Sequence, residues 1–118
     1  MSTVYEIWQM EKRVWLNGPH ENVDLVLPAA LILVPPLRTP QRFEAFVEAT
    51  RGVEPFLDVE FKNRVYAESG NATVISYVAE ATHPQVEGVY RASCQTVYVD
   101  IEDEAKVLSH HHVVLPKE

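Results

Sequence analysis

The 118-residue chain has little cysteine, few basic residues and no long apolar run. Its one cysteine, Cys94, cannot form a disulfide within the chain. No apolar run approaches the roughly 18 to 20 residues of a membrane-spanning helix. Acidic residues also interrupt the apolar amino terminus, so we expect no secretory signal. These absences favour a cytoplasmic protein that does not bind membranes.

Basic residues are outnumbered, because ten lysines and arginines accompany seventeen acidic residues and the formal net charge is −7. An acidic chain without a basic cluster repels phosphate backbones, so we expect no binding to nucleic acid. Neither an internal repeat nor a linker divides the sequence. Its length therefore predicts a single domain over residues 1–118, with one modest hydrophobic core.

The first half of the chain has a largely helical pattern. Apolar residues recur every three to four positions from Thr3 to Asn17, and Gly18 and Pro19 then end the helix. Farther on, Thr39 supplies a hydroxyl N-cap directly before a proline, which is typical of a helix start. The expected elements are a helix over residues 3–17, a short helix over 19–27, a buried strand over 29–34 and a third helix from Thr39.

From Pro55 onward the apolar pattern changes to a period of two, which indicates strands. Turn-forming residues separate these strands, and the acidic segment 100–104 is expected at a hairpin tip. The expected strands cover residues 58–67, 72–82, 89–99 and 105–115. Helices followed by a series of antiparallel strands predict an α+β fold.

Glu11 lies in the middle of the apolar stripe of the first helix, between Trp8 and Trp15. Burying an unpaired carboxylate is costly, so its position needs an explanation. One interpretation pairs Glu11 with an arginine or with backbone N–H groups. The other has it facing a pocket beneath the helix, where the indoles would raise its pKa toward general acid or base duty. The sequence leaves both interpretations open.

Three consecutive histidines occupy the last expected strand. Because successive side chains on a strand alternate in direction, His110 and His112 share one face and His111 takes the other. Two histidines supply two metal ligands, whereas zinc normally uses three or four protein ligands in a structural or catalytic site. We therefore expect neither a metal site nor a cofactor.

The pairing of the strands decides which polar residues join the histidines. We expect Asp100 opposite Ala105 in the last hairpin, and Thr82 opposite Gly88 in the hairpin before it. This register predicts a polar face that suits a pocket wall approached by Glu11. Its expected members are Tyr77, Arg91, Ser93, Gln95, His110 and His112. A one-residue slip in either hairpin would break this grouping.

Three segments resemble the nuclear-transport-factor-2-like superfamily, and within it the small SnoaL-like proteins related to ketosteroid isomerase. Residues 5–15 resemble its first helix, residues 90–99 its penultimate long strand, and residues 105–116 its last strand. The resemblance implies a cone in which a curved antiparallel sheet wraps around N-terminal helices, with an apolar pocket at its mouth. It also implies a homodimer that pairs through the outer face of the sheet. The last segment lacks the family's Gln-Gln-Thr, so either His110 or His112 could align with the family histidine.

The residues that carry ketosteroid isomerase chemistry are not present in the same positions. Residues 31–36 contain no acid, and the first-helix position where the resemblance implies a phenol holds Trp15. The first hypothesis is therefore that an apolar pocket binds a small organic molecule. The alternatives are an acid–base isomerase, dehydratase or cyclase acting on a carbonyl compound, and a ligand-free dimeric interaction module. The catalytic candidates are Glu11, His110 and His112, and the candidate ligand contacts are Trp8, Trp15, Tyr77, Arg91, Ser93 and Gln95.

Overall fold

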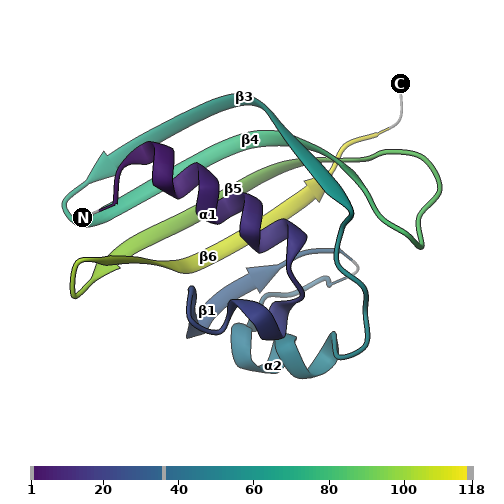
Figure 1. Cartoon of the computed structure of the whole chain (residues 1–118), viewed down its shortest axis with the longest axis horizontal. Helices are drawn as coiled ribbons and strands as arrows, with labels where there is room; N and C mark the ends of the chain where they lie inside the picture. Colours follow the sequence, from purple (N-terminus) through teal and green to yellow (C-terminus); the bar gives the residue numbers. More distant parts are fainter. Residues whose placement is uncertain (1, 36, 117–118) are drawn as a thin grey trace.

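The computed structural model describes residues 2–35 and 37–116, and Figure 1 shows how their helices and strands are arranged. Helix α1 lies across one face of a sheet, and the shorter α2 lies beside β1 (Figure 1). The helices are α1 (Val4–Leu16), the 3₁₀ helix η1 (Pro19–Asn22) and α2 (Phe43–Ala49). The strands are β1 (Val26–Leu33), β2 (Gln41–Arg42), β3 (Asp58–Ser69), β4 (Ala72–Thr82), β5 (Tyr90–Ile101) and β6 (Glu104–Val114).

Helix α1 begins where the sequence predicts. The Thr3 hydroxyl accepts a hydrogen bond from the Glu6 backbone N–H at 3.2 Å, and the Glu6 carboxylate accepts one from the Thr3 N–H at 3.0 Å. This reciprocal pair is a capping box, which satisfies two donors that a helix start leaves unpaired. The buried face consists of Ile7, Glu11 and Trp15, one helical turn apart. The predicted helix is therefore confirmed, with Glu11 on its inner face.

The segment between α1 and β3 differs from the expected one. The helix expected over residues 19–27 is wrong, because η1 ends at Asn22 and Val26 already belongs to β1. Helix α2 begins at Phe43 rather than near Thr39, because the two residues before it are extended and pair with β1. Edge pairing of the backbone thus prevails over the local helix-start signal.

The six strands form one sheet in the order β2-β1-β6-β5-β4-β3. Strand β1 runs parallel to β6, and the other neighbouring strands are antiparallel. The α+β class is confirmed, although one strand pair departs from the expected antiparallel sheet. In β3, the register shifts between Lys62 and Val65, where Asn63 has a positive φ of 54°. A bulge of this kind bends the strand and sharpens its twist, which helps the sheet curve around α1.

The hairpin of β4 and β5 is shifted by one residue from the expected register. Tyr77 pairs with Cys94 rather than with Ser93, and Ala81 pairs with Tyr90. In this register several small side chains of β4 and β5 lie on the inner face of the sheet. These are Ala79, Ala81, Ala92 and Cys94, all at most 2% exposed.

The hairpin of β5 and β6 starts in the expected register and then departs from it. Asp100 pairs with Ala105 as expected, and Tyr98 still pairs with Val107. Leu108 has no partner on β5, so the register shifts there. One extra residue in one strand is a β-bulge, and it reverses which residues beyond it share a face.

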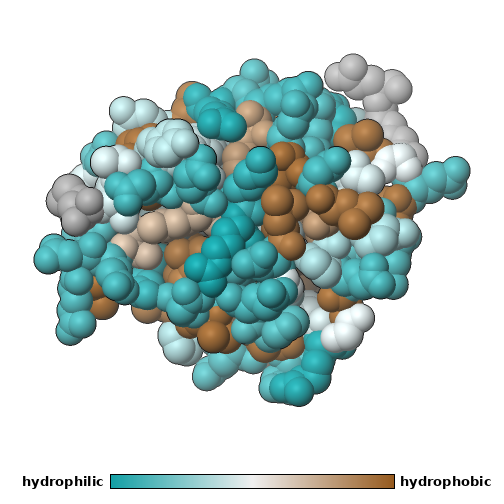
Figure 2. Space-filling model, in the orientation of Figure 1, coloured by the Kyte–Doolittle hydropathy of each residue, from teal (hydrophilic) through white to brown (hydrophobic). Residues whose placement is uncertain are grey.

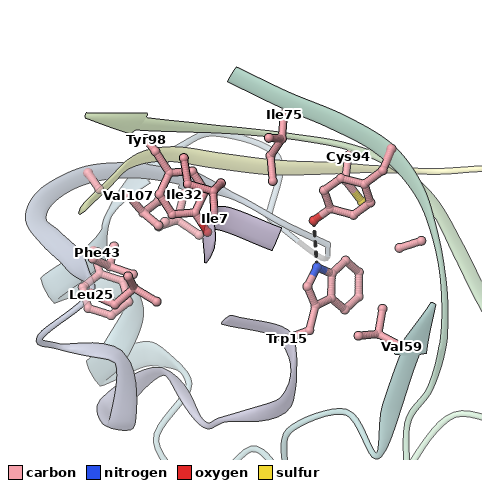
Figure 3. Packing of buried hydrophobic residues seen from close by; sticks show 14 of the residues in the cluster. Ile7, Trp15, Leu25, Ile32, Phe43, Val59, Ile75, Cys94, Tyr98 and Val107 are labelled. Atoms are coloured by element: carbon pink, nitrogen blue, oxygen red, sulfur yellow. Dashed lines mark hydrogen bonds between the residues drawn. The ribbon is translucent and has the colours of Figure 1, made fainter. Parts of the chain in front are cut away.

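The buried hydrophobic residues lie between α1 and the sheet and extend toward α2 (Figure 3). Trp15 is central among them, because it lies in contact distance of side chains from β5, β6 and the segment before β3. No helix in the described part of the chain is long and apolar enough to span a membrane.

Candidate functional site

A cavity of about 630 Å³ lies between the C-terminal half of α1, β1, α2 and the C-terminal half of β6. Its wall is mostly aliphatic and aromatic; examples are Trp15, Ile32, Phe43, Phe46, Phe56 and Val107. Two polar residues of this wall are buried, His110 of β6 and Asn22 of η1. The half-buried His112 lines the cavity next to His110. An apolar cavity with a few polar groups is the usual form of a small-molecule site.

Glu11 lies next to this cavity but does not line it, and its side chain is 0% exposed. Three hydroxyl groups of the sheet donate hydrogen bonds to its carboxylate. Thr96 donates to Oε2 at 2.6 Å, Tyr98 donates to Oε1 at 2.7 Å, and Tyr77 also donates to Oε2. His110 Nδ1 is 3.4 Å from Oε2. Glu11 is therefore paired, though with hydroxyls and an imidazole rather than the arginine or backbone donors considered from the sequence.

His110 and His112 connect the Glu11 cluster to the cavity. His110 Nδ1 is 2.6 Å from Thr96 Oγ1, and its Nε2 is 2.8 Å from His112 Nε2. His112 Nδ1 is in turn 3.2 Å from the hydroxyl of Tyr90, which also lines the cavity. The His112 ring stacks on the Trp15 indole with centroids 4.3 Å apart and an interplanar angle of 3°. This stacking fixes the plane in which the histidine nitrogens make their bonds.

The network determines the protonation of its members. Burial alone would raise the pKa of the Glu11 carboxyl, but His110 and the hydrogen bonds from Thr96 and Tyr77 outweigh burial and lower it. The raised carboxyl pKa considered from the sequence is therefore not found. Burial, with His110 and His111 nearby, lowers the pKa of His112 well below its ordinary value.

The tyrosines of the network stay protonated. Burial first, and then the negative charge of Glu11, raise the pKa values of Tyr77 and Tyr98 well above the ordinary range. Burial also raises the pKa of Tyr90. All three hydroxyls are therefore neutral donors at physiological pH. A further bond, from Trp15 Nε1 to Tyr77 Oη at 2.8 Å, ties the cavity wall to the cluster (Figure 3).

Five of the expected ligand contacts do not line the cavity: Trp8, Tyr77, Arg91, Ser93 and Gln95. Arg91, Ser93 and Gln95 lie on the outer face of the sheet, because the register shift in the β4–β5 hairpin reverses the faces of β5. Arg91 forms an ion pair with Glu80 there, at 3.1 Å. Trp8 packs against Phe61 near the other end of α1 and is likewise absent from the cavity wall.

The remaining expected residues are brought together. Trp15, His110 and His112 line the cavity, and Glu11 and Tyr77 lie directly behind them. Reasoning from the sequence missed Thr96, Tyr98, Tyr90 and Asn22. Thr96 and Tyr98 alternate with Ser93 and Gln95 along the strand, so the predicted register puts them on the face opposite the expected pocket wall. No local pattern distinguishes Tyr90 and Asn22. Asn22 is 2% exposed, and within the described ranges its Oδ1 has no hydrogen-bond partner.

The described residues contain no group of three or more His, Cys, Asp or Glu side chains placed to hold a metal ion. The two cavity histidines use their ring nitrogens in the hydrogen bonds given above. They form a hydrogen-bonding pair, and the second nitrogen of each ring is also engaged.

No family model matches this chain, and no curated protein matches it. Solved structures do match. An NTF2-like protein from Cytophaga hutchinsonii superposes with a TM-score of 0.79 at 16% identity, over 98% of this chain and 100% of that one. The chain has an NTF2-like fold. In this NTF2-like fold, the cavity described above lies within the cone that the sheet and helices form.

Two further solved structures superpose on this chain. A candidate ketosteroid isomerase from Parabacteroides distasonis has a TM-score of 0.79 at 18% identity, over 92% of this chain and 85% of that one. A candidate calcium/calmodulin-dependent protein kinase II association domain from Xanthomonas campestris has a TM-score of 0.73 at 17% identity, with coverages of 98% and 87%. Likeness at such low identity concerns the NTF2-like fold and not the activity.

Proposed function

We propose that the protein binds a small, largely apolar organic molecule in the cavity. One polar group of this ligand would form a hydrogen bond at the part of the wall where Tyr90 and His112 lie. The observation that carries this proposal is the contrast within the wall. Aromatic and aliphatic side chains make up most of it, while a buried network supports the histidine pair at one place. Apolar walls provide affinity by excluding water, and a few fixed polar groups orient the ligand.

The size of the cavity supports the same proposal. A volume of about 630 Å³ lies within the range of roughly 300–1,000 Å³ that accommodates metabolite- or drug-sized molecules. Two residues of its wall, Val53 and Val86, are 52% and 48% exposed, which places apolar side chains at a rim that meets solvent. Figure 2 shows apolar side chains gathered among hydrophilic ones on the right of this face. Asn22 offers a second polar contact inside.

Binding of the apolar dye Nile red tests the proposal. We expect saturable binding, seen as a rise in its fluorescence, and at least about a tenfold loss of affinity for Ala49→Trp, which corresponds to 1.4 kcal/mol. Ala49 lines the cavity from the last turn of α2, so an indole there occupies part of it. The matched control is Ala45→Trp, because Ala45 is exposed on the same helix, as Ala49 is, but does not line the cavity. Equal effects of the two variants, or no binding by the wild type, would refute the proposal.

We propose as a second function that two copies pair through the outer face of the sheet. Three large apolar side chains are exposed on that face: Leu31 at 42%, Val65 at 60% and Val113 at 59%. No helix of the described chain covers them, whereas α1 covers the opposite face. A stable pair needs about 800 Å² of each partner. Light scattering at micromolar concentration tests the pairing, and a monomer mass there would contradict it.

A further inference from the structure

A continuous series of polar contacts joins the Glu11 carboxylate to the cavity. Thr96 Oγ1 donates to Glu11 Oε2 at 2.6 Å and lies 2.6 Å from His110 Nδ1. His110 Nε2 lies 2.8 Å from His112 Nε2, and His112 Nδ1 lies 3.2 Å from the Tyr90 hydroxyl. Every link is within hydrogen-bond distance, from a fully buried residue to a half-buried one on the cavity wall.

When both histidines are neutral, the donors of this series all have the same direction. Because Thr96 gives its proton to Glu11, its oxygen accepts the proton of His110 Nδ1. In neutral His110 the other nitrogen, Nε2, is then an acceptor, so His112 Nε2 carries the proton between the rings. His112 Nδ1 accepts in turn from the Tyr90 hydroxyl. All the protons therefore point from the cavity toward the carboxylate, as a relay for removing a proton requires.

We propose that Tyr90 is the residue through which the cavity exchanges a proton with its ligand, and that this ligand carries an acidic O–H group, such as a phenol or an enol. This inference rests on the proposed binding function and names the chemical class of the ligand. Tyr90 is a binding residue that touches the ligand, His112 and His110 conduct the proton, and Glu11 is a positioning residue.

The transfer is balanced in protons and needs no other reactant. The ligand O–H bond breaks and its proton joins the Tyr90 oxygen, while the Tyr90 proton moves to His112 Nδ1. The proton on His112 Nε2 moves to His110 Nε2, so three bonds to hydrogen break and three form. The ligand becomes an oxyanion that accepts a hydrogen bond from Tyr90. His110 becomes an imidazolium, 3.4 Å from the Glu11 carboxylate.

His110 is the member of the series that lies beside a carboxylate, because its Nδ1 is 3.4 Å from Glu11 Oε2. Glu11 is therefore placed to attract a positive charge at the inner end of the series. His112 has a lowered pKa and Tyr90 a raised one, so both conduct a proton without retaining a charge. The other ionisable side chains that line the cavity are Glu54 and His83, and His83 Nε2 is 2.8 Å from the Glu54 backbone oxygen.

Para-nitrophenol is a suitable probe, because its anion is yellow and its neutral form is not. We expect the bound phenol to ionise at a pH at least about one unit below that in free solution, which is a tenfold larger ratio of phenolate to phenol at a given pH. Tyr90→Phe, which removes one half-buried hydroxyl, should abolish most of this shift and still bind the probe. Glu11→Gln should do the same, because the imidazolium then has no carboxylate beside it. The matched control is His111→Gln, on the opposite face of β6, which should keep the shift.

The outcomes separate this inference from the binding function on which it rests. If neither para-nitrophenol nor Nile red binds the wild type, the proposed function itself fails. If the phenol binds without a change in its ionisation, or if Tyr90→Phe keeps the full shift, the assignment of Tyr90 is overturned. A Glu11→Gln variant that does not fold leaves the Tyr90→Phe comparison decisive, since that hydroxyl makes one contact of 3.2 Å in the described structure.

Discussion

Replacing Glu11 by glutamine removes the charge around which three buried hydroxyl groups are arranged. Thr96, Tyr77 and Tyr98 all donate to this carboxylate, which is 0% exposed. A hydrogen bond to a charged group contributes about 1.5–3 kcal/mol, and one between neutral groups about 0.5–1.5 kcal/mol. Three bonds that each lose about 1 kcal/mol predict a total loss of about 3 kcal/mol in the free energy of unfolding.

The new amide adds a conflict of donors. If its NH₂ group takes the place of Oε2, it faces the hydroxyls of Thr96 and Tyr77, which donate in the wild type. Thr96 can rotate its hydroxyl, but Tyr77 Oη already accepts from Trp15 Nε1. At least one buried donor then has no acceptor, and such an unpaired group costs about 1–3 kcal/mol. The loss is therefore expected at or above about 3 kcal/mol, within the range of about 3–5 kcal/mol for breaking a buried pair.

Urea unfolding followed by tryptophan fluorescence measures this loss. With a slope of about 2 kcal/mol per molar, 3 kcal/mol lowers the midpoint by about 1.5 M. The control is Glu6→Gln on the same helix, because a glutamine can also complete the capping box, so its midpoint should match that of the wild type. A loss below about 1 kcal/mol for Glu11→Gln, or a gain, would refute the pairing described above. In a double-mutant cycle with Tyr98→Phe, strict additivity would do the same.

Three other measurements address neighbouring features. Since the pKa of His112 is lowered from 6.5, the unfolded chain binds its proton first, so stability should fall below pH 6.5 by up to about 1.4 kcal/mol per pH unit. His112→Phe should flatten that slope in urea midpoints, and an unchanged slope would contradict the lowered pKa. Burial and Glu11 raise the pKa of Cys94 to about 12, so Ellman's reagent should react only as the protein unfolds. Rapid reaction of the native thiol would contradict its burial. Val113→Asp should shift the mass in light scattering from dimer to monomer, and an unchanged dimer mass would place the interface elsewhere.

Periodicity was sufficient to predict the parts of the fold that depend on local burial. Helix α1 follows from apolar residues spaced along one face, and that spacing also places Glu11 inside. The alternation of β6 puts His110 and His112 on one face, and both line the cavity. The proximity of Glu11 and His110 could therefore be predicted from two periods, 3.6 residues for helix α1 and 2 residues for strand β6.

Register could not be predicted in the same way, because β5 has polar residues on both of its faces. Ser93 and Gln95 alternate with Cys94 and Thr96, so polarity alone does not distinguish the wet face from the buried one. The bulge at Leu108 likewise cannot be recognised from the sequence. No glycine or proline marks it, and its effect is to keep the histidines on the inner face although β5 has shifted. The shift between β4 and β5 exchanges the two faces of β5 relative to the prediction. The bulge in β6 cancels that exchange for the histidines, which stay on the predicted face.

The buried position of Glu11 indicates the register of β5 that alternation alone does not. A buried glutamate on α1 requires donors, and the sheet face beneath it must supply them because the apolar helix stripe cannot. One face of β5 offers Thr96 and Tyr98, whose hydroxyls donate while their methyl and ring carbons pack as core. The opposite face offers Ser93 and Gln95, whose small or flexible polar side chains are both exposed. Burial of Glu11 therefore favours the register in which hydroxyls on bulky or branched residues face α1. The burial of the Glu11 carboxylate therefore favours both the hydrogen bonds of the site and the register of β5, because the same hydroxyl groups that donate to Glu11 must face α1.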